Sequence, residues 1–494
     1  MKALSSVLFA LTLSLVSAKP GPEHRRGDEQ PFIHVPLAHS DDYASGRVHM
    51  QLMDAMTAAV AGIRADAVRT TGIFDPMLGI RPIKAYTPCV DGYAGTEANN
   101  TYMCRNLDLY AFAPHGDMGS AAMVGNDVWG WAHTSTSGGA TREFGLVGQM
   151  DGTAFVEVLS TGQIAYLGRL PTQSEWSIWR DIKVIGHYAY IGSEALGHGI
   201  QVFDLLKLLD KSLLDHPKEF SIETDLTALY DELPQGSSHN VVSHADKNLI
   251  VAVGAQPRLD KCAAGLIFID VTDPANPTTA GCAGDDGYVH DAQCLTYHGP
   301  DAKYDGFDVC YSFNEDTFTI YNITDPSSPS VISATFYHGV SYSHQGWVTD
   351  VKNQSYLLLN DELDEMFQRG WATDQKTTTY IWDITDLARP VLTGKHKSPV
   401  VAIDHNLYVH NSLAYESNYK SGLRIVDVSS IAADPTGASF VEAAFFDGHP
   451  EDDAQGGEAV FGGAWSVYPY FASGHVLVNT LERGLFVVKY NKTV

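Results

Sequence analysis

The chain has 494 residues and a formal net charge of −27 at pH 7, from 59 acidic and 32 basic side chains. This charge argues against nucleic acid and anionic membrane surfaces as partners, because binding to either requires a basic surface. The apolar content supports a large core, and no segment after the N-terminal stretch is long enough to span a membrane. Motifs of serine hydrolases, nucleotide-binding loops and zinc proteases are missing from the sequence.

The N-terminus has the pattern of a secretory signal. A basic start at Lys2, an apolar run from Leu4 to Val16 and the small residues Ser17-Ala18 predict a signal peptide over residues 1–18. Residues 19–40 are rich in proline and charge, which predicts a disordered stretch or a pro-segment. We therefore expect a secreted, extracellular protein.

Cysteines and glycosylation motifs fit an extracellular protein. Proximity in the sequence favours three disulfides, Cys89–Cys104, Cys262–Cys282 and Cys294–Cys310, although six cysteines allow about fifteen pairings. From Asn-x-Ser/Thr triplets we predict glycosylation at four asparagines. They are Asn100, Asn322, Asn353 and Asn491.

Residues 41–120 differ in pattern from the rest of the chain. Leu52, Met53, Met56, Val60 and Ile63 recur at helical spacing between Asp41 and about Arg69, which predicts one amphipathic helix. The residues from 73 to 120 are predicted to be irregular and contain the first cysteine pair. We expect this segment to pack as an extension on the remaining domain.

Residues 121–494 form a repeat array. A β-strand ending in Asp and followed by a turn recurs seven times, most clearly at Gly265–Asp270 before Asp273-Pro274. Each unit of about 50 residues has room for four strands. The sequence therefore predicts an all-β fold, a seven-bladed β-propeller with an N-terminal helical and irregular extension. The last unit lacks an outer strand, and we expect the segment before Asn126 to supply it.

A histidine recurs at one position of four consecutive units. His239, His290, His344 and His405 lie 51, 54 and 61 residues apart, each just before an apolar strand. Acidic residues recur just after the second predicted strand of five units. They are Glu194, Glu315, Glu362, Glu416 and Glu482. In an antiparallel blade both positions lie at the same end, so we expect histidines and carboxylates on one face of the disc.

Other units carry different side chains at the histidine position. Arg180 precedes Asp181 in the second unit, Asp291 follows His290, and Trp465 stands in the last unit, with Trp131 expected near it. Convergent polar groups beside aromatic rings are typical of a ligand pocket. In a second interpretation the histidines hydrogen-bond neighbouring strands and the acids cap turns, without any ligand.

Several stretches resemble a known family. The units resemble LVIVD repeats, and the chain from about residue 85 to 490 is similar to the secreted choice-of-anchor B family. The matching stretches include 125–131, 179–184, 290–294, 344–347, 360–365, 403–408 and 462–466. The resemblance implies a propeller and assigns no activity. The chain departs from the bacterial members by the expected lack of an anchoring tail.

Two functions follow as hypotheses. In the first, the propeller binds an extracellular carbohydrate or protein in a central funnel lined by His and Asp/Glu. In the second, it is a metal- or histidine-dependent lyase or hydrolase of acidic carbohydrate, with His290 and His344 as catalytic groups and Arg180 holding the sugar carboxylate. The cofactor is unknown, and a divalent metal ion bound by the four histidines is one possibility.

Overall fold

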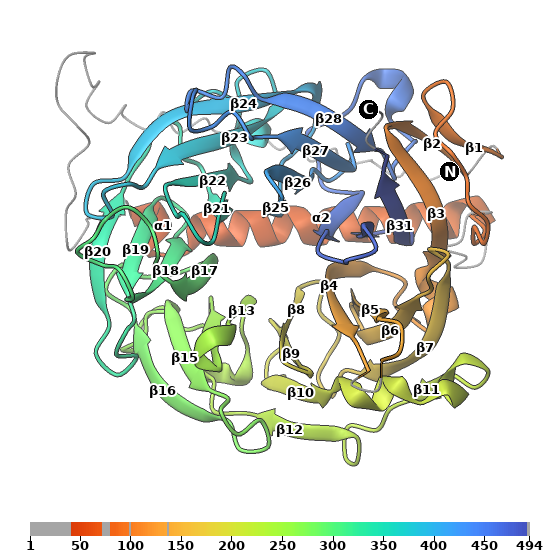
Figure 1. Cartoon of the computed structure of the whole chain (residues 1–494), viewed down its shortest axis with the longest axis horizontal. Coiled ribbons are helices and arrows are strands. Elements are labelled where there is room, and N and C mark those ends of the chain that lie inside the picture. The colour runs from red at the N-terminus through yellow and green to blue at the C-terminus, as the bar shows by residue number, and fades with distance from the viewer. Residues whose placement is uncertain (1–40, 72–79, 98–99, 136–137, 492–494) are drawn as a thin grey trace, which may run out of the picture.

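Seven β-sheets are arranged around a central axis in the computed structural model (Figure 1). The structure describes residues 41–71, 80–97, 100–135 and 138–491, so the predicted signal peptide and the segment 19–40 lie outside the described residues. Each sheet is one blade with its first strand nearest the axis. The predicted seven-bladed β-propeller is confirmed.

The blades are numbered here in chain order. Blade 1 has β4 (Gly125–His133), β5 (Arg142–Gln149), β6 (Gly152–Val158), β7 (Ile164–Pro171) and β11 (Lys218–Glu219). Blade 2 has β8 (Arg180–Ile185), β9 (Tyr188–Ser193), β10 (Ile200–Asp204) and β12 (Leu226–Tyr230). Blade 3 has β13 (Asn240–His244), β14 (Leu249–Val253), β15 (Leu266–Asp270) and β16 (Thr278–Ala283).

The remaining blades are built in the same way. Blade 4 has β17 (Asp291–Thr296), β18 (Asp308–Phe313), β19 (Phe318–Asn322) and β20 (Ser330–Thr335). Blade 5 has β21 (Ser343–Val348), β22 (Tyr356–Asp361), β23 (Lys376–Asp383) and β24 (Val391–Val401), with α3 (Asp364–Phe367) after β22. Blade 6 has β25 (Leu407–His410), β26 (Leu413–Ser417), β27 (Leu423–Asp427) and β28 (Val441–Phe446). Blade 7 has β29 (Ala464–Tyr468), β30 (His475–Thr480) and β31 (Gly484–Tyr490).

The strand ending in Asp combines a continuous buried apolar run with an Asp that starts the turn. The four apolar residues of β15 that precede Asp270 are buried, and the Asp270 carboxylate accepts a hydrogen bond from the Thr272 backbone N–H at 2.8 Å. Asp383 and Asp427 do the same for the N–H two residues on. These side chains start the turn to the outer strand, as Asp does in Asx turns.

The N-terminal segment completes two blades. Strand β3 (Leu107–Pro114) pairs antiparallel with β31 and supplies the outer strand of blade 7. Strand β2 (Asn100–Arg105) pairs with β28 of blade 6, and β1 (Tyr93–Glu97) pairs with β2. Residues 93–114 are therefore largely strands, where an irregular segment was expected. The pairing of β3 confirms that the segment before Asn126 supplies the outer strand of the last unit. The partner of β2 lies more than 330 residues away, so the local sequence gave no sign of that pairing.

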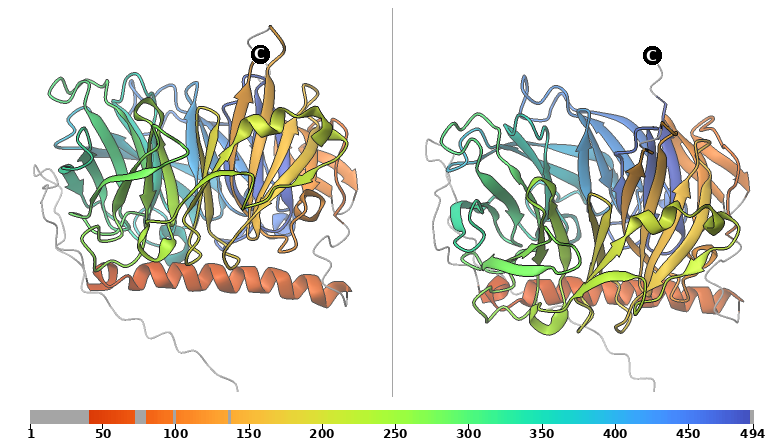
Figure 2. Two further views of the ribbon diagram at one scale, coloured as in Figure 1. Left: turned by 90° about the horizontal axis from the view of Figure 1, so that it is seen from below. Right: turned by 60° about the horizontal axis from the view of Figure 1, so that its bottom comes forward.

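Helix α2 (Arg47–Thr71) lies along one face of the disc and crosses its centre (Figures 1 and 2). The buried side chains Leu52, Met56 and Val60 pack on residues from the loops of several blades, including Tyr342 and Tyr419. A single helix was expected from Asp41. The structure instead has a short α1 (Asp41–Ala44), and Gly46, with φ of 75°, separates it from α2.

The three predicted disulfides, Cys89–Cys104, Cys262–Cys282 and Cys294–Cys310, are all formed. One glycosylation prediction was wrong. The triplet around Asn100 begins at Asn99, which lies outside the described residues, and Asn100 itself is followed by Thr101-Tyr102 and is buried. Asn353 is exposed. Among the described residues, no helix is long and apolar enough to cross a membrane.

Candidate functional site

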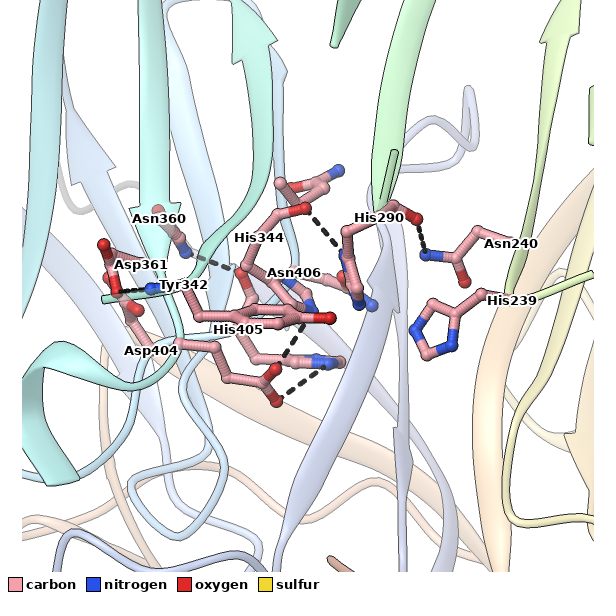
Figure 3. A network of polar contacts seen from close by, with 12 residues as sticks. His239, Asn240, His290, Tyr342, His344, Asn360, Asp361, Asp404, His405 and Asn406 are labelled. Atoms are coloured by element: carbon pink, nitrogen blue, oxygen red, sulfur yellow. Dashed lines mark hydrogen bonds and ion pairs between the residues drawn. The ribbon is translucent and has the colours of Figure 1, made fainter. Parts of the chain in front are cut away.

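The four repeated histidines lie side by side (Figure 3), on the face of the disc that α2 covers. Their rings follow one another around the axis, with centroids 4.3 Å apart from His239 to His290, 4.2 Å to His344 and 4.4 Å to His405. Each side chain stands at the start of the innermost strand of its blade, so the repeat places them on one arc. All four are buried, at 1–4% exposed.

Two of these rings are oriented by the next blade. His290 Nδ1 lies 2.9 Å from the His344 carbonyl oxygen, and His405 Nδ1 lies 2.6 Å from the Trp465 carbonyl oxygen. A carbonyl only accepts, so each Nδ1 carries the proton and donates. These two nitrogens therefore hydrogen-bond a neighbouring blade, as expected from the interpretation without a ligand. The Nε2 atom of each neutral ring is left as a free electron-pair donor.

The ring nitrogens of His344 have fewer hydrogen bonds than those of its neighbours. Its Nδ1 is buried and makes no hydrogen bond, and its Nε2 lies 3.5 Å from Glu362 Oε2. His405 Nε2 lies 3.7 Å from the other oxygen of the same carboxylate. A buried nitrogen without a partner costs free energy, so this site has capacity for a further bound group.

Glu362 follows β22 and is the carboxylate that faces the arc. The Tyr419 hydroxyl donates to its Oε1 at 2.6 Å, which fixes the side chain between His344 and His405. Burial raises the pKa of Glu362 to about 7. A nearby cation would lower that pKa and favour the carboxylate.

Burial also sets the charge of the histidines. It lowers the pKa of His290 and His344 well below the ordinary value and that of His405 to about 3, so the three rings are neutral at pH 7. His239 differs. Burial opposes its charged form, but Glu194, whose Oε1 lies 2.7 Å from Nδ1, raises the pKa of His239 overall.

A fifth histidine comes from α2. His49 is 6% exposed, its Nδ1 lies 2.7 Å from the Tyr342 hydroxyl, and its Nε2 lies 3.8 Å from Glu194 Oε1. It lies outside the repeats, so the repeat pattern did not identify it. His49 precedes Leu52 and Met56 by three and seven residues, so it belongs to the buried stripe of the helix. That spacing was the signal that could have identified it.

The arrangement suits a metal ion. His290, His344 and Glu362 each offer one ligand atom, and these three atoms lie within 4.8 Å of one another; His49, Glu194 and His239 form a second such group. Two imidazoles and a carboxylate are a common ligand set for zinc and similar divalent ions. The unpartnered Nδ1 shows in addition that the polar contacts of His344 are incomplete.

Arg180 and Asp181 lie at the same end but have partners within the fold. Arg180 is 1% exposed, donates to the Gln149 carbonyl oxygen at 3.1 Å and lies 2.8 Å from His198 Nε2. Asp181 accepts from the Val241 N–H at 2.7 Å and pairs with Lys183 at 2.7 Å. Both residues connect neighbouring blades.

Asp291 directly follows His290, and its carboxylate accepts a hydrogen bond from the Ala292 backbone N–H at 2.7 Å. Burial, reinforced by Asp181, raises the pKa of Asp291 to about 7. His239 acts in the opposite direction and lowers the pKa of Asp291, so one ring of the arc also acts on this carboxyl.

Three of the recurring acids have partners away from the arc. Glu315 forms a two-pronged ion pair with Arg258, and Glu416 accepts from Thr379 and Asn418. Glu482 pairs with His449 at 2.5 Å. Glu194 and Glu362, in contrast, contact the repeated histidines.

The two tryptophans are separated. The Trp465 ring lies 5.1 Å from the His405 ring, edge to face, as expected for a neighbour of the arc. The Trp131 indole donates to the Gly186 carbonyl oxygen at 3.1 Å and packs on Phe144 in a core cluster of blades 1 and 2.

Comparisons with known proteins address the repeat and the fold. A family model described as the LVIVD repeat matches residues 179–196, which include β8 and β9. No curated protein was found to match. A similar solved structure is the crystal structure of the Myceliophteria thermophila Cps50 (Swd1) β-propeller domain, with 12% identity, a TM-score of 0.41, and coverage of 70% of this chain and 93% of that one. The chain is therefore a seven-bladed β-propeller in which one segment, residues 179–196, matches the LVIVD repeat.

Proposed function

We propose that this protein binds a divalent transition-metal ion at the α2-covered end of its channel, through His290, His344 and Glu362. The observation that carries the proposal is the convergence of these three ligand atoms within 4.8 Å, together with the unpartnered Nδ1 of His344. His239 and His405 flank the ligands as further imidazoles.

The protonation states support the same conclusion. Metal binding requires neutral imidazole, and burial keeps His290 and His344 neutral at pH 7. The hydrogen bond from His290 Nδ1 to a backbone carbonyl directs Nε2 toward the site, as outer-shell partners of metal ligands do. Nitrogen and carboxylate donors favour Zn²⁺ over Ca²⁺ or Mg²⁺.

The burial of the site favours an ion over a sugar as the ligand. The histidines are 1–4% exposed beneath α2, so a saccharide ring would reach them only if the helix moved. Arg180, the residue expected to hold a uronate, is buried against Gln149 and His198. Both observations favour metal binding over catalysis on a carbohydrate. A bound ion would supply Lewis-acid character at this end of the channel.

We place this function outside the cell. Three disulfides in a chain of this length are typical of an oxidising compartment. The N-terminal signal pattern supports the same location, and so does the resemblance to a secreted family.

The test is metal binding by the purified protein and by ligand variants. After removal of metals, titration with Co²⁺ followed by visible absorption, and with Zn²⁺ by calorimetry, should give one strong site. His344→Ala and Glu362→Gln should each weaken binding by more than about 10–100-fold, because even outer-shell changes have effects of that size.

His298→Ala is the matched control, since His298 has a side chain 58% exposed and lies outside the site. It should bind as the unmodified protein does. A protein that binds neither ion, or variants that bind as tightly as the control, would refute the proposal.

A further inference from the structure

Three carboxylates gather in the interior next to the histidine site but outside it. Asp364 and Glu365 begin α3, after β22 of blade 5, and Asp404 precedes β25 of blade 6. One oxygen from each lies within 4.8 Å of the other two, and each residue is 0% exposed. The whole acidic segment from residue 361 to 365 is buried.

The hydrogen bonds of this cluster are incomplete. Both carboxylate oxygens of Asp404 and Oδ1 of Asp364 are buried and have no hydrogen-bond partner. The other oxygens have one donor each: Tyr380 for Asp364, and the backbone N–H groups of Thr378 and Asp404 for Glu365. An aspartate with two bare oxygens in the interior is a strong departure from the rule that buried polar groups are satisfied.

The charge is also unbalanced. Within the described ranges, no lysine, arginine or histidine side chain forms an ion pair with any of the three residues. Asp361 adds a fourth buried carboxylate nearby, although the Ser341 and Tyr342 N–H groups and the Tyr337 hydroxyl satisfy its oxygens. Such a group must either take up protons or bind a cation.

We infer that Asp364, Glu365 and Asp404 bind a calcium ion. All donors are hard oxygen atoms, which favour Ca²⁺ over the softer metals suited to the histidine site. Ca²⁺ takes about six to eight oxygens, and carboxylates of this kind supply one or two each. Mg²⁺ fits less well, because it retains several waters and this cluster is fully buried.

The ion would connect two segments that also carry the histidine site. Glu362 lies two residues before Asp364, and His405 directly follows Asp404. A cation shared by blades 5 and 6 would therefore fix the loop that presents Glu362 to His344. The calcium site rests on its own residues and does not require a metal at the histidines.

Thermal unfolding with and without Ca²⁺ tests the inference. After EDTA treatment, adding Ca²⁺ should raise the Tm by several degrees, because an ion that binds only the folded state stabilises it. Asp404→Asn, which keeps the shape and removes one charge, should fold without Ca²⁺ and lose this increase. Terbium, a Ca²⁺ substitute, should show sensitised emission in the unmodified protein, with Tyr380 as donor, and none in Asp404→Asn.

Asp231→Asn is the matched control, because Asp231 is exposed and the substitution changes the charge equally. Its Tm increase should equal that of the unmodified protein, and so should that of His344→Ala, whose effect is confined to the histidine site. If EDTA fails to strip the ion, elemental analysis should find about one calcium per chain, and none in Asp404→Asn. No calcium and no Tm increase, or an equal increase in Asp404→Asn, would overturn the inference.

Discussion

At the scale of single residues, a buried ion pair connects blade 7 to the loop after β28. His449 Nδ1 lies 2.5 Å from Glu482 Oε1, and the Gly463 N–H donates to the same carboxylate. Burial opposes both charges, but the partners outweigh it: Glu482 raises the pKa of His449 to about 9, and His449 lowers the pKa of Glu482 to about 2.

This pair predicts a particular pH dependence. The pKa of His449 is raised on folding, so its contribution to stability is complete below about pH 6.5 and is lost as the pH rises through about 9. Glu482 contributes above about pH 4.5 and loses its contribution toward pH 2. Loss of the His449 proton should lower the free energy of unfolding of the unmodified protein by about 3 kcal/mol between pH 6.5 and 9. His449→Gln should lack this part of the decrease.

Urea unfolding at pH 6.0 and pH 9.5 measures that change. His298→Gln serves as the control, because the His298 side chain is 58% exposed, and it should keep the full decline. Parallel pH profiles in the unmodified protein and in His449→Gln would contradict the assignment of the pair.

The repeated histidines were predictable because a repeat fixes position in space. The positions of the acids were less predictable. A carboxylate after the second strand faces the arc of histidines only where its loop turns the side chain in that direction. Glu362 is held toward the rings by Tyr419, whereas Arg258 draws Glu315 to itself. Those partners come from other blades, and no local pattern identifies them.

At the scale of elements, the sequence predicted α2 but not the surface of the propeller on which it packs. Its stripe of Leu52, Met56 and Val60 showed that one face is buried, but not against what. The surface that receives it is assembled from loops of separate blades, with Tyr342, Ile403 and Phe461 among them. Such a surface exists only after the ring has formed, so it cannot be recognised in any one segment.

Packing of this stripe should hold the helix on the disc. Met56 is 1% exposed, and Met56→Asp places a charge in an apolar contact, at a cost above the ~2–5 kcal/mol of truncating a buried methionine. We expect α2 to detach while the propeller stays folded. Hydrogen exchange should show faster exchange over residues 47–64 and little change in the inner strands.

Met50→Asp provides the comparison on the same helix, because Met50 is 62% exposed. Its exchange should match that of the unmodified protein. Equal protection of α2 in the two variants would mean that contacts other than the stripe hold the helix.

At the scale of the whole molecule, the last strand, β31, pairs with β3 from the N-terminal part of the chain and closes the ring. Seven copies of a strand–turn pattern predicted the ring, and the missing outer strand of the last copy predicted its closure. The structure adds that β1 and β2 extend blade 6. That pairing was not predictable, because edge pairing depends on the position of β28 after folding rather than on the sequence of β2.

Closure by β3 should control the stability of the entire ring. Phe112 on β3 is 1% exposed and stacks on Phe486 of β31 with centroids 4.4 Å apart. Phe112→Ala should lower the unfolding free energy by about 3–5 kcal/mol, because it leaves a cavity where the chain ends join. Tyr93→Ala, on β1 and 49% exposed, should change it by less than about 0.5 kcal/mol. Urea unfolding followed by tryptophan fluorescence and by far-UV circular dichroism should show both signals shifting together, since every blade depends on its two neighbours. Separate transitions in Phe112→Ala would instead mean that blade 7 opens alone.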